Sequence, residues 1–440
     1  MQNTWRERRT SDSHKPFSGE SVRRVLIPAV ALLCSAALLA AKPTRPSYLF
    51  IWAGDSAGKA SDFLAVIDAT PSSPHYGEVV TSIPTGVAGA HPHHTEGEMP
   101  ANGHLLANGF HAARTWLFDL TKPLTPRILT SFGDLGGYSH PHTYVRTANG
   151  HVLATFQYHA MPGDMEMHHT GGAMSMSDSV EHTTGGIVEM DERGRLIRSG
   201  DASDASIDQK HIYPYSVLPM PSINRAISTT TDMNDADTLA TSEWIQFWRL
   251  SDLKLLKSIA LKPGPRGNEN RYTGEPRLLA DGKSVYIHTF NCGLYLLRDI
   301  DRPQPRATFV MAFEGANCGV PLLSGHYWIQ PVPEAHALVS MDITDPLHPH
   351  EVSRVTLDKD EWPHWLSMEA TGRRFVLNSG GYGKTDRLYV INFNPASGAL
   401  SLDDKFRDKG SDTPGISMRG RTWPQGFIGK VLPHGTVFSR

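Results

Sequence analysis

Alternating apolar and polar residues recur along the chain in short runs, each followed by a turn and by a second run of the same kind. Seven such pairs occur, at residues 62–83, 115–132, 185–200, 243–261, 292–313, 336–357 and 387–406. Alternation over about four to eight residues, bounded by Pro, Asp, Asn or Gly, is typical of a β-hairpin. Most pairs follow another hairpin, built on turns such as 101–103, 148–150, 280–282 and 370–372. Four strands per repeat, at a spacing of about 40 to 70 residues, predict an all-β chain folded as a seven-bladed β-propeller.

The order of the strands predicts how the ring closes. Each repeat begins with a short strand that should lie innermost, and we expect these strands within 92–99, 141–147, 214–220, 275–279, 320–324 and 363–369. The seventh segment of this kind, PHGTVFS at 433–439, comes after the last hairpin, at the end of the chain. It can complete only the blade that begins with 48–54 and 62–68. We therefore expect the C-terminal strand to join the N-terminal blade, which removes an open sheet edge.

An apolar run without charge, VLIPAVALLCSAALLAA, covers residues 25–41 and follows a basic stretch. This layout is typical of a secretory signal, although an uncleaved membrane anchor is the alternative reading. We expect residues 1–41 to be a signal peptide or an N-terminal membrane segment, and residues 42–440 to form a single propeller. Arg23 and Arg24 also permit a twin-arginine signal. The body should be exported to the periplasm, with membrane contact only through residues 25–41 if they are not removed.

Charge and cysteine content narrow the classes of function. Forty-two Lys and Arg residues against forty-five Asp and Glu give a formal net charge of -3. Nucleic-acid binders normally carry a basic face, so this balance argues against a nucleic-acid partner. Beyond the signal, the chain has two cysteines, Cys292 and Cys318. In an oxidising compartment they form either one disulfide or two buried thiols, and the sequence leaves both open.

Histidines mark the predicted innermost strands. Four of the seven segments carry one at what the pattern gives as the same repeat position, with His93 beside the first: His94, His142, His364 and His434. Innermost strands line the channel of a propeller, so these imidazoles should converge and form a transition-metal site. The alternative is that they fill the channel and bond to backbone carbonyls. Two further histidines, His91 and His140, are offset by two positions and are expected to support the ligands from behind.

A second histidine-rich stretch lies at residues 159–182, HAMPGDMEMHHTGGAMSMSDSVEH. Methionine in a polar insertion gains little from burial, and thioether together with imidazole favours copper, particularly the reduced ion. We expect an auxiliary copper site here, at Met165, Met167, His168 and His169. Fortuitous low complexity is the alternative.

Several segments together resemble the selenium-binding protein and methanethiol oxidase family. They are IWAGD (51–55), SDFLAVIDATPSSPHYGEV (61–79), the His93-His94 pair, SHPHTYVRTANGHVLATF (139–156) and LPHG (432–435). The resemblance covers nearly the whole body, with a divergent centre. It implies a seven-bladed propeller and copper-dependent oxidation of methanethiol or a related small thiol by O2 and water, giving formaldehyde, hydrogen sulfide and hydrogen peroxide.

The family's histidines can be carried over one by one. They fall on His93 and His94, then on His142 and on His434, whereas His364 rests on the repeat register alone. One departure concerns selenium. Animal members place a selenium-linked cysteine after the SPxY pattern, where this chain has Gly77, so selenium binding through that residue is in question.

Two other classes of function remain open from the sequence. The protein could be a non-enzymatic copper or selenium carrier of the periplasm, whose main site would be the Met/His insertion. It could also be a propeller scaffold or a lactonase-like hydrolase with structural channel histidines, because propellers host many functions. No proton donor can be assigned from sequence, and Glu275 is a candidate only for a polar wall residue.

Overall fold

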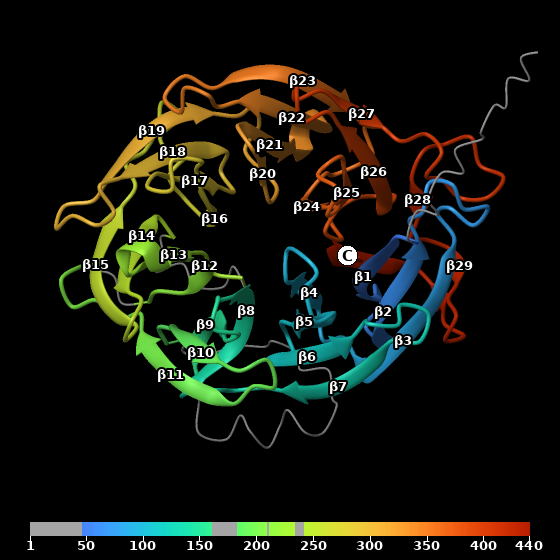
Figure 1. The fold of residues 1–440 in the computed structure, drawn as a ribbon, viewed down its shortest axis with the longest axis horizontal. Coiled ribbons are helices and arrows are strands. Elements are labelled where there is room, and N and C mark those ends of the chain that lie inside the picture. The colour runs from blue at the N-terminus through green and yellow to red at the C-terminus, as the bar shows by residue number, and fades with distance from the viewer. Residues whose placement is uncertain (1–45, 161–182, 209–210, 234–241) are drawn as a thin grey trace, which may run out of the picture. The chain divides into compact units, whose positions relative to one another are not determined.

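A computed structural model describes residues 46–160, 183–208, 211–233 and 242–440. They form seven antiparallel sheets arranged as the blades of a ring, each running from an innermost to an outermost strand (Figure 1). Blade 1 contains β31 (Val431–Phe438), β1 (Tyr48–Asp55), β2 (Ser61–Asp68) and β3 (Val79–Ala88). Blade 2 contains β4 (Pro92–Thr95), β5 (His104–Gly109), β6 (Arg114–Asp119) and β7 (Arg127–Phe132). Blade 3 contains β8 (Tyr138–Arg146), β9 (Val152–His159), β10 (Gly186–Met190) and β11 (Leu196–Asp201).

The remaining blades repeat this order. Blade 4 contains β12 (Pro214–Met220), β13 (Arg225–Thr230), β14 (Trp244–Arg249) and β15 (Lys254–Ala260). Blade 5 contains β16 (Thr273–Leu278), β17 (Val285–Thr289), β18 (Gly293–Arg298) and β19 (Arg306–Ala312). Blade 6 contains β20 (Leu322–Ser324), β21 (Tyr327–Val332), β22 (Ala337–Asp342) and β23 (His350–Thr356). Blade 7 contains β24 (Trp365–Met368), β25 (Arg374–Asn378), β26 (Arg387–Phe393) and β27 (Leu400–Leu402).

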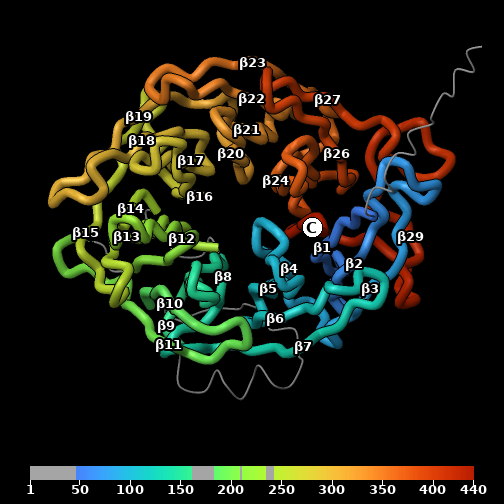
Figure 2. The backbone as a smooth tube through the Cα atoms, in the orientation of Figure 1, coloured from blue at the N-terminus to red at the C-terminus, as the bar shows by residue number. Residues whose placement is uncertain are grey.

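The predicted seven-bladed propeller is confirmed, including the strand that closes it. All seven segments expected to hold an innermost strand do so, and β31 pairs antiparallel with β1, with Leu49 opposite Phe438 and Ile51 opposite Thr436. Figure 2 shows the chain circling once from its blue to its red end and finishing beside β1. The last strand therefore covers the inner edge of β1.

The apolar core lies between the blades. Seven clusters of buried side chains each join two neighbouring blades. Successive side chains of a strand point to opposite faces of its sheet, and both faces of each blade pack against a neighbouring blade. The cluster at the closure contains Phe63 and Phe438 of blade 1 with Val390 of blade 7. Closure is thus stabilised by burial between the first and last blades as well as by hydrogen bonds.

Few elements depart from the repeat. In the described residues the helices are two single 3₁₀ turns, η1 (Pro221–Ile223) and η2 (Pro333–Ala335). After the last predicted hairpin, β28 (Ile416–Ser417) also pairs with β26, and β29 (Arg421–Thr422) pairs with β30 (Ile428–Gly429). Cys292 and Cys318 form a disulfide across 26 positions of sequence, so the bridge, rather than two free thiols, is present.

Two sequence predictions fall on residues that the structure does not describe. The expected signal or membrane segment at residues 1–41 is one, and the auxiliary ligands Met165, Met167, His168 and His169 are the other. In the part of the chain that is described, no helix combines the length and apolarity needed to cross a membrane.

Candidate metal centre

A bulge near the start of the innermost strands directs the histidines of the channel. In β4 the regular register is interrupted between Pro92 and Thr95, and in β8 between Pro141 and Tyr144. The backbone N–H inside each bulge bonds to a side chain of the second strand. The N–H of His94 donates to Asn108 Oδ1 at 2.6 Å. A bulge turns two consecutive side chains away from the regular alternation, which lets them face the channel.

The bulges define equivalent positions and correct one prediction. The Thr143 N–H donates to Thr155 Oγ1 at 3.1 Å, as that of His94 does to Asn108, so Thr143 is the counterpart of His94. His93 is therefore the counterpart of His142, and both follow a proline, as do His364 and His434. The expectation that His94 holds the shared repeat position is wrong, because the preceding proline marks that position and in blade 2 the residue after the proline is His93.

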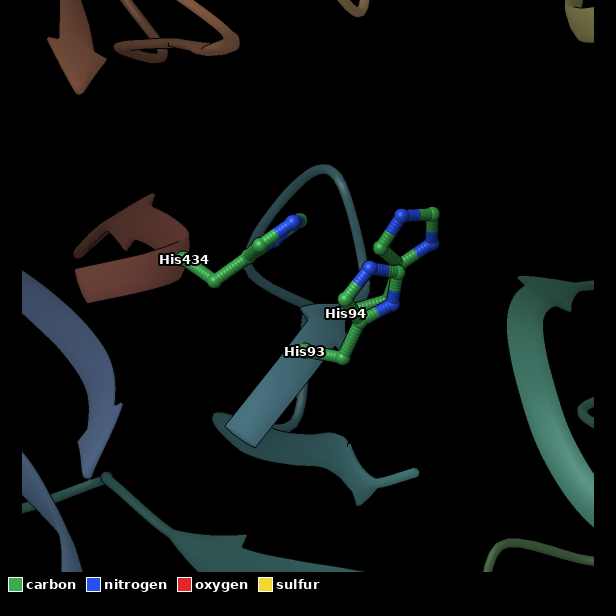
Figure 3. Close-up of side chains that lie close together, drawn as sticks. All are labelled: His93, His94 and His434. Atoms are coloured by element: carbon green, nitrogen blue, oxygen red, sulfur yellow. The ribbon is translucent and has the colours of Figure 1, made fainter. Parts of the chain in front are cut away.

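Three imidazoles meet at the centre of the ring. One nitrogen from each of His93, His94 and His434 lies within 4.8 Å of the others, and all three residues are buried. Figure 3 shows His434 reaching from β31 towards the pair on β4. The rings of His93 and His94 stack with centroids 4.4 Å apart, and those of His93 and His434 lie 4.0 Å apart. Residues from the first blade's closing strand and from the second blade thus share one site.

His142 completes this cluster from blade 3. Its ring centroid lies 4.1 Å from that of His94 and 4.9 Å from that of His93. Its Nδ1 lies 2.7 Å from the carbonyl oxygen of Tyr215, which can only accept. The proton is therefore on Nδ1, and Nε2 carries the free lone pair. His142 is not one of the three histidines whose nitrogens lie within 4.8 Å of one another, but its ring contacts the rings of His93 and His94.

Several nitrogens of the cluster have no hydrogen-bond partner although they are buried. They are Nδ1 of His93, Nε2 of His142 and both ring nitrogens of His434. A buried polar atom without a partner costs about 1 to 3 kcal/mol, so folded proteins retain few of them. Imidazole nitrogens left unsatisfied and close together are what a metal ion would satisfy. The residues present therefore fit a transition metal.

The electrostatics of the cluster keep its imidazoles neutral. Burial lowers the pKa of His142 to about 3, against a smaller opposing effect of the Tyr215 carbonyl. Burial, followed by the neighbouring imidazoles, holds the pKa of His93, His94 and His434 well below the usual range. A neutral imidazole offers a lone pair, so the site requires no deprotonation of these side chains before a metal binds at neutral pH.

His94 differs from its neighbours because both its nitrogens have polar contacts. Nδ1 lies 3.4 Å from Thr143 Oγ1, and Nε2 lies 3.3 Å from the Tyr215 hydroxyl. The Thr143 hydroxyl donates to the Tyr215 carbonyl at 3.0 Å, so it accepts from His94 Nδ1. Nε2 is then the acceptor for the Tyr215 O–H. Tyr215 therefore places a hydroxyl proton next to a candidate ligand.

The other predicted residues are close to the cluster but not within it. The ring of His364 lies 5.2 Å from that of His434, and burial lowers its pKa to about 4. His91 packs against His93 with centroids 5.5 Å apart, and its buried Nδ1 has no hydrogen-bond partner. The ring of His140 contacts Phe110, which also contacts the ring of His142. The supporting role expected of His91 and His140 stays a prediction.

A cavity of about 540 Å³ opens beside the cluster. His93 and His364 contribute to its wall, together with Tyr215, Phe290 and the disulfide-bonded Cys318. The lining residues lie in the innermost strands, in the segments that precede them or in the turns that follow the second strands, so they share one rim of the ring. A ligand of moderate size would reach the imidazoles through this cavity.

Sequence reasoning missed two features of the site. Tyr215 follows Pro214 in blade 4 as His142 follows Pro141 in blade 3, so the Pro-X pattern carried the signal. The contact between His91 and His111, with centroids 4.2 Å apart, had no such signal. It depends on the fold of the turn after β5, which alternation does not describe.

No protein-family model matches the chain. A methanethiol oxidase of Hyphomicrobium sp is 26% identical in an alignment 310 residues long, which covers 60% of this chain and 70% of the relative. An X-ray structure of a hypothetical selenium-binding protein from Sulfolobus tokodaii matches with a TM-score of 0.67 at 17% identity, over 90% of this chain and 94% of that one. The periplasmic gluconolactonase of Pseudomonas aeruginosa matches with a TM-score of 0.58 at 12% identity, over 90% and 99%.

At such low identity the two structural likenesses show the fold alone, and the likeness in sequence is to a methanethiol oxidase. The methanethiol oxidase is related by sequence over most of its length. The first of the two structures, a hypothetical selenium-binding protein, shares the propeller at the higher TM-score. The chain is a divergent relative of the selenium-binding protein and methanethiol oxidase family.

Proposed function

We propose that the protein is a copper-dependent oxidase of small thiols, which converts methanethiol or a related thiol with O2 and water to an aldehyde, hydrogen sulfide and hydrogen peroxide. The observation that carries the proposal is the buried imidazole cluster with unsatisfied nitrogens. The 26% identity to a methanethiol oxidase supports the choice of reaction. Imidazole ligands also suit zinc, iron or nickel, so we choose copper because of the proposed reaction and not because of the ligands.

Four histidines would hold the metal. His93, His142 and His434 offer nitrogens without another partner, and His94 offers Nε2 once the Tyr215 hydroxyl yields it. A bound copper ion would supply the one-electron chemistry that links oxidation of a thiol to reduction of O2. The protein supplies the ligands in their neutral form and in a fixed tautomer, as the His142 bond to the Tyr215 carbonyl shows for Nδ1.

The other residues bind the thiol and handle its proton. The cavity wall carries aromatic and apolar groups beside polar ones, and an apolar thiol would lie against the aromatic groups next to the imidazoles. The Tyr215 hydroxyl lies 3.3 Å from His94 Nε2 and is buried, so it can hold a proton beside the reacting sulfur. Burial, and then Glu275, raise the pKa of Tyr215 well above its usual value, which keeps this proton in place at neutral pH.

We also propose that the protein works outside the cytoplasm. The basic stretch followed by the apolar residues 25–41 supports export. The disulfide between Cys292 and Cys318 adds support, because such bridges persist in oxidising compartments. Detection of the mature protein in a periplasmic fraction, with an N-terminus beyond residue 41, is the expected result. Retention in the cytoplasmic fraction would contradict this part of the proposal.

The activity itself is tested by adding methanethiol to copper-loaded and to copper-free protein in the presence of O2. Formation of formaldehyde, hydrogen sulfide and hydrogen peroxide in equal amounts, only with copper, is expected. Absence of all three products with fully loaded protein would overturn the oxidase.

The copper-loaded and copper-free samples also distinguish the oxidase from two other functions. The gluconolactonase shares the fold, so a lactonase-like hydrolase is one alternative. Such an enzyme would hydrolyse a lactone whether or not copper is bound. A carrier would bind copper but leave methanethiol unchanged. Its main site, the Met/His insertion, lies outside the described residues.

A further inference from the structure

The cavity beside the imidazole cluster is larger than the smallest thiols need. Its volume of about 540 Å³ falls in the range of pockets that enclose drug-sized ligands. Methanethiol has a single carbon atom and a sulfur, so it would leave most of this space to water. A small ligand that touches little of its pocket gains little affinity from it.

The wall of the cavity is aromatic. Tyr215 and Phe290 lie with ring centroids 5.4 Å apart, and Phe290 stacks on His364 at 6.2 Å with an interplanar angle of 16°. The ring centroids of Tyr382 and His364 lie 5.2 Å apart, edge to face. Tyr272 and Trp362 line the same cavity. Rings from three blades thus form one surface that prefers a flat apolar group, through stacking and edge contacts.

This aromatic wall leads directly to the proposed reaction centre. His93 belongs both to the cavity wall and to the three-histidine group. His364 joins the aromatic wall to His434, whose ring lies 5.2 Å away. A ligand with sulfur at the imidazoles and its tail in the cavity would therefore lie against Phe290 and Tyr382.

The charges of the residues that line the cavity restrict which groups the tail of the ligand can carry. Among the described residues that line the cavity, none is lysine or arginine. Asp232 is the acidic one, and its Oδ1 accepts a bond from the Tyr158 hydroxyl at 2.9 Å. Arg277 acts electrostatically on His94 and Tyr215, but it lies outside the cavity wall and pairs with Glu275 at 2.9 Å. A carboxylate or sulfonate in the cavity would therefore lose its hydration without meeting an unpaired cationic side chain, which is costly.

We propose that the substrates of this site are primary thiols, R–CH2–SH, in which R is a bulky apolar group such as an aromatic ring and carries no negative charge. The inference rests on the proposed thiol oxidase and extends it from methanethiol to this class. For phenylmethanethiol the reaction consumes one O2 and one water and gives benzaldehyde, hydrogen sulfide and hydrogen peroxide. The carbon–sulfur bond breaks, a carbon–oxygen double bond forms with oxygen from water, and O2 takes the two electrons and two protons.

The test compares three thiols on the copper-loaded protein: phenylmethanethiol, methanethiol and anionic 2-mercaptoethanesulfonate. We expect kcat/KM for phenylmethanethiol to exceed that for methanethiol by about tenfold or more, and the sulfonate to be the poorest substrate. Methanethiol turned over as fast as or faster than phenylmethanethiol would overturn the inference alone. No turnover of any thiol would overturn the proposed function, and the inference with it.

A binding measurement removes the dependence on copper. Calorimetric titration of copper-free protein without oxygen should show saturable binding of phenylmethanethiol and none of the sulfonate at the same concentration. Equal binding of the two, or binding of neither, would count against the aromatic cavity as the selecting element.

Substitutions in the cavity wall test whether its aromatic side chains cause the preference for phenylmethanethiol. Tyr382 is 58% exposed, so Tyr382→Ala should fold, and it should lower the preference for phenylmethanethiol over methanethiol about fivefold. Tyr382→Phe keeps the ring and should keep the preference. Leu124→Ala removes an apolar side chain that is 54% exposed and outside the cavity, and it serves as the matched control. A preference unchanged in Tyr382→Ala and in Trp362→Ala would contradict the assignment.

Discussion

Tyr215 is the residue whose chemistry distinguishes this site from a plain cluster of histidines. Its carbonyl fixes the tautomer of His142, and its hydroxyl lies 3.3 Å from Nε2 of His94. Tyr215→Phe keeps the ring and the carbonyl but removes the proton. We expect kcat for thiol oxidation to fall about a hundredfold, with the copper content unchanged, since the proton handled in the transition state is lost. Activity and copper are measured on the same sample, and equal kcat in both proteins would rule out a role for the hydroxyl.

Asp62 gives the structure a dependence on pH that is separate from the metal. Burial raises its pKa to about 7, and only Oδ2 has a partner, the N–H of Ala90 at 2.7 Å. Between about pH 4 and 7 the folded chain therefore binds a proton that the unfolded chain releases. The free energy of unfolding should fall as the pH rises through this window, on account of this group.

The change Asp62→Asn should remove this part of the pH dependence. The amide matches the protonated acid in shape, so the variant should be more stable than the parent at pH 8, by up to a few kcal/mol, and similar to it near pH 4. Urea denaturation at both pH values measures the difference. Asp412→Asn, on a side chain exposed to solvent, is the control. A variant less stable than the parent at pH 8 would show that the folded protein stabilises the ionised carboxylate, which contradicts a raised pKa for Asp62.

At the scale of elements, β31 joins the closure of the ring to the candidate metal centre. The strand carries His434 into the cluster and Phe438 into the core between blades 1 and 7. Phe438 is 2% exposed, so Phe438→Ala should cost about 3 to 5 kcal/mol of stability, and the loosened strand should lower copper affinity as well. Leu432→Ala, at a half-buried position of the same strand, should cost less. If Phe438→Ala left both stability and metal affinity unchanged, the packing of β31 that closes the ring would not be what positions the metal site.

The disulfide is a second link between elements. Cys292 lies in the turn between β17 and β18, and Cys318 lies in the segment that leads to β20 and lines the cavity. A bridge that closes a loop of 26 positions should stabilise the fold by about 3 kcal/mol. Denaturation of the Cys292→Ser, Cys318→Ser double variant in comparison with the oxidised parent measures this, and the reduced parent is the control for the serine substitutions themselves. Identical unfolding curves for the oxidised parent and the double variant would contradict it.

At the scale of the whole molecule, the sequence predicts the ring better than it predicts the site. Alternation and the terminal PHGTVFS determine the blades and their closure, because both follow from hairpin periodicity. Pro-His pairs locate three of the clustered histidines and make His93 the counterpart of His142, but the contribution of His94 depends on the bulge in β4, which alternation does not reveal. The Pro-X pattern points to the position of Tyr215, but the contact of its hydroxyl with His94 and the aromatic cavity depend on side-chain directions across blades, which local sequence does not give.

The central claim is that the imidazoles of three blades bind one copper ion. Its most direct test is the copper content of protein purified without a histidine tag, loaded with copper and freed of excess, measured by mass spectrometry. We predict that the His93→Ala, His434→Ala double variant holds about one copper per chain fewer than the parent, and that His348→Ala, at an exposed histidine outside the innermost strands, holds as much as the parent. A double variant that folds and keeps as much copper as the parent, or a parent that binds none, would contradict the account.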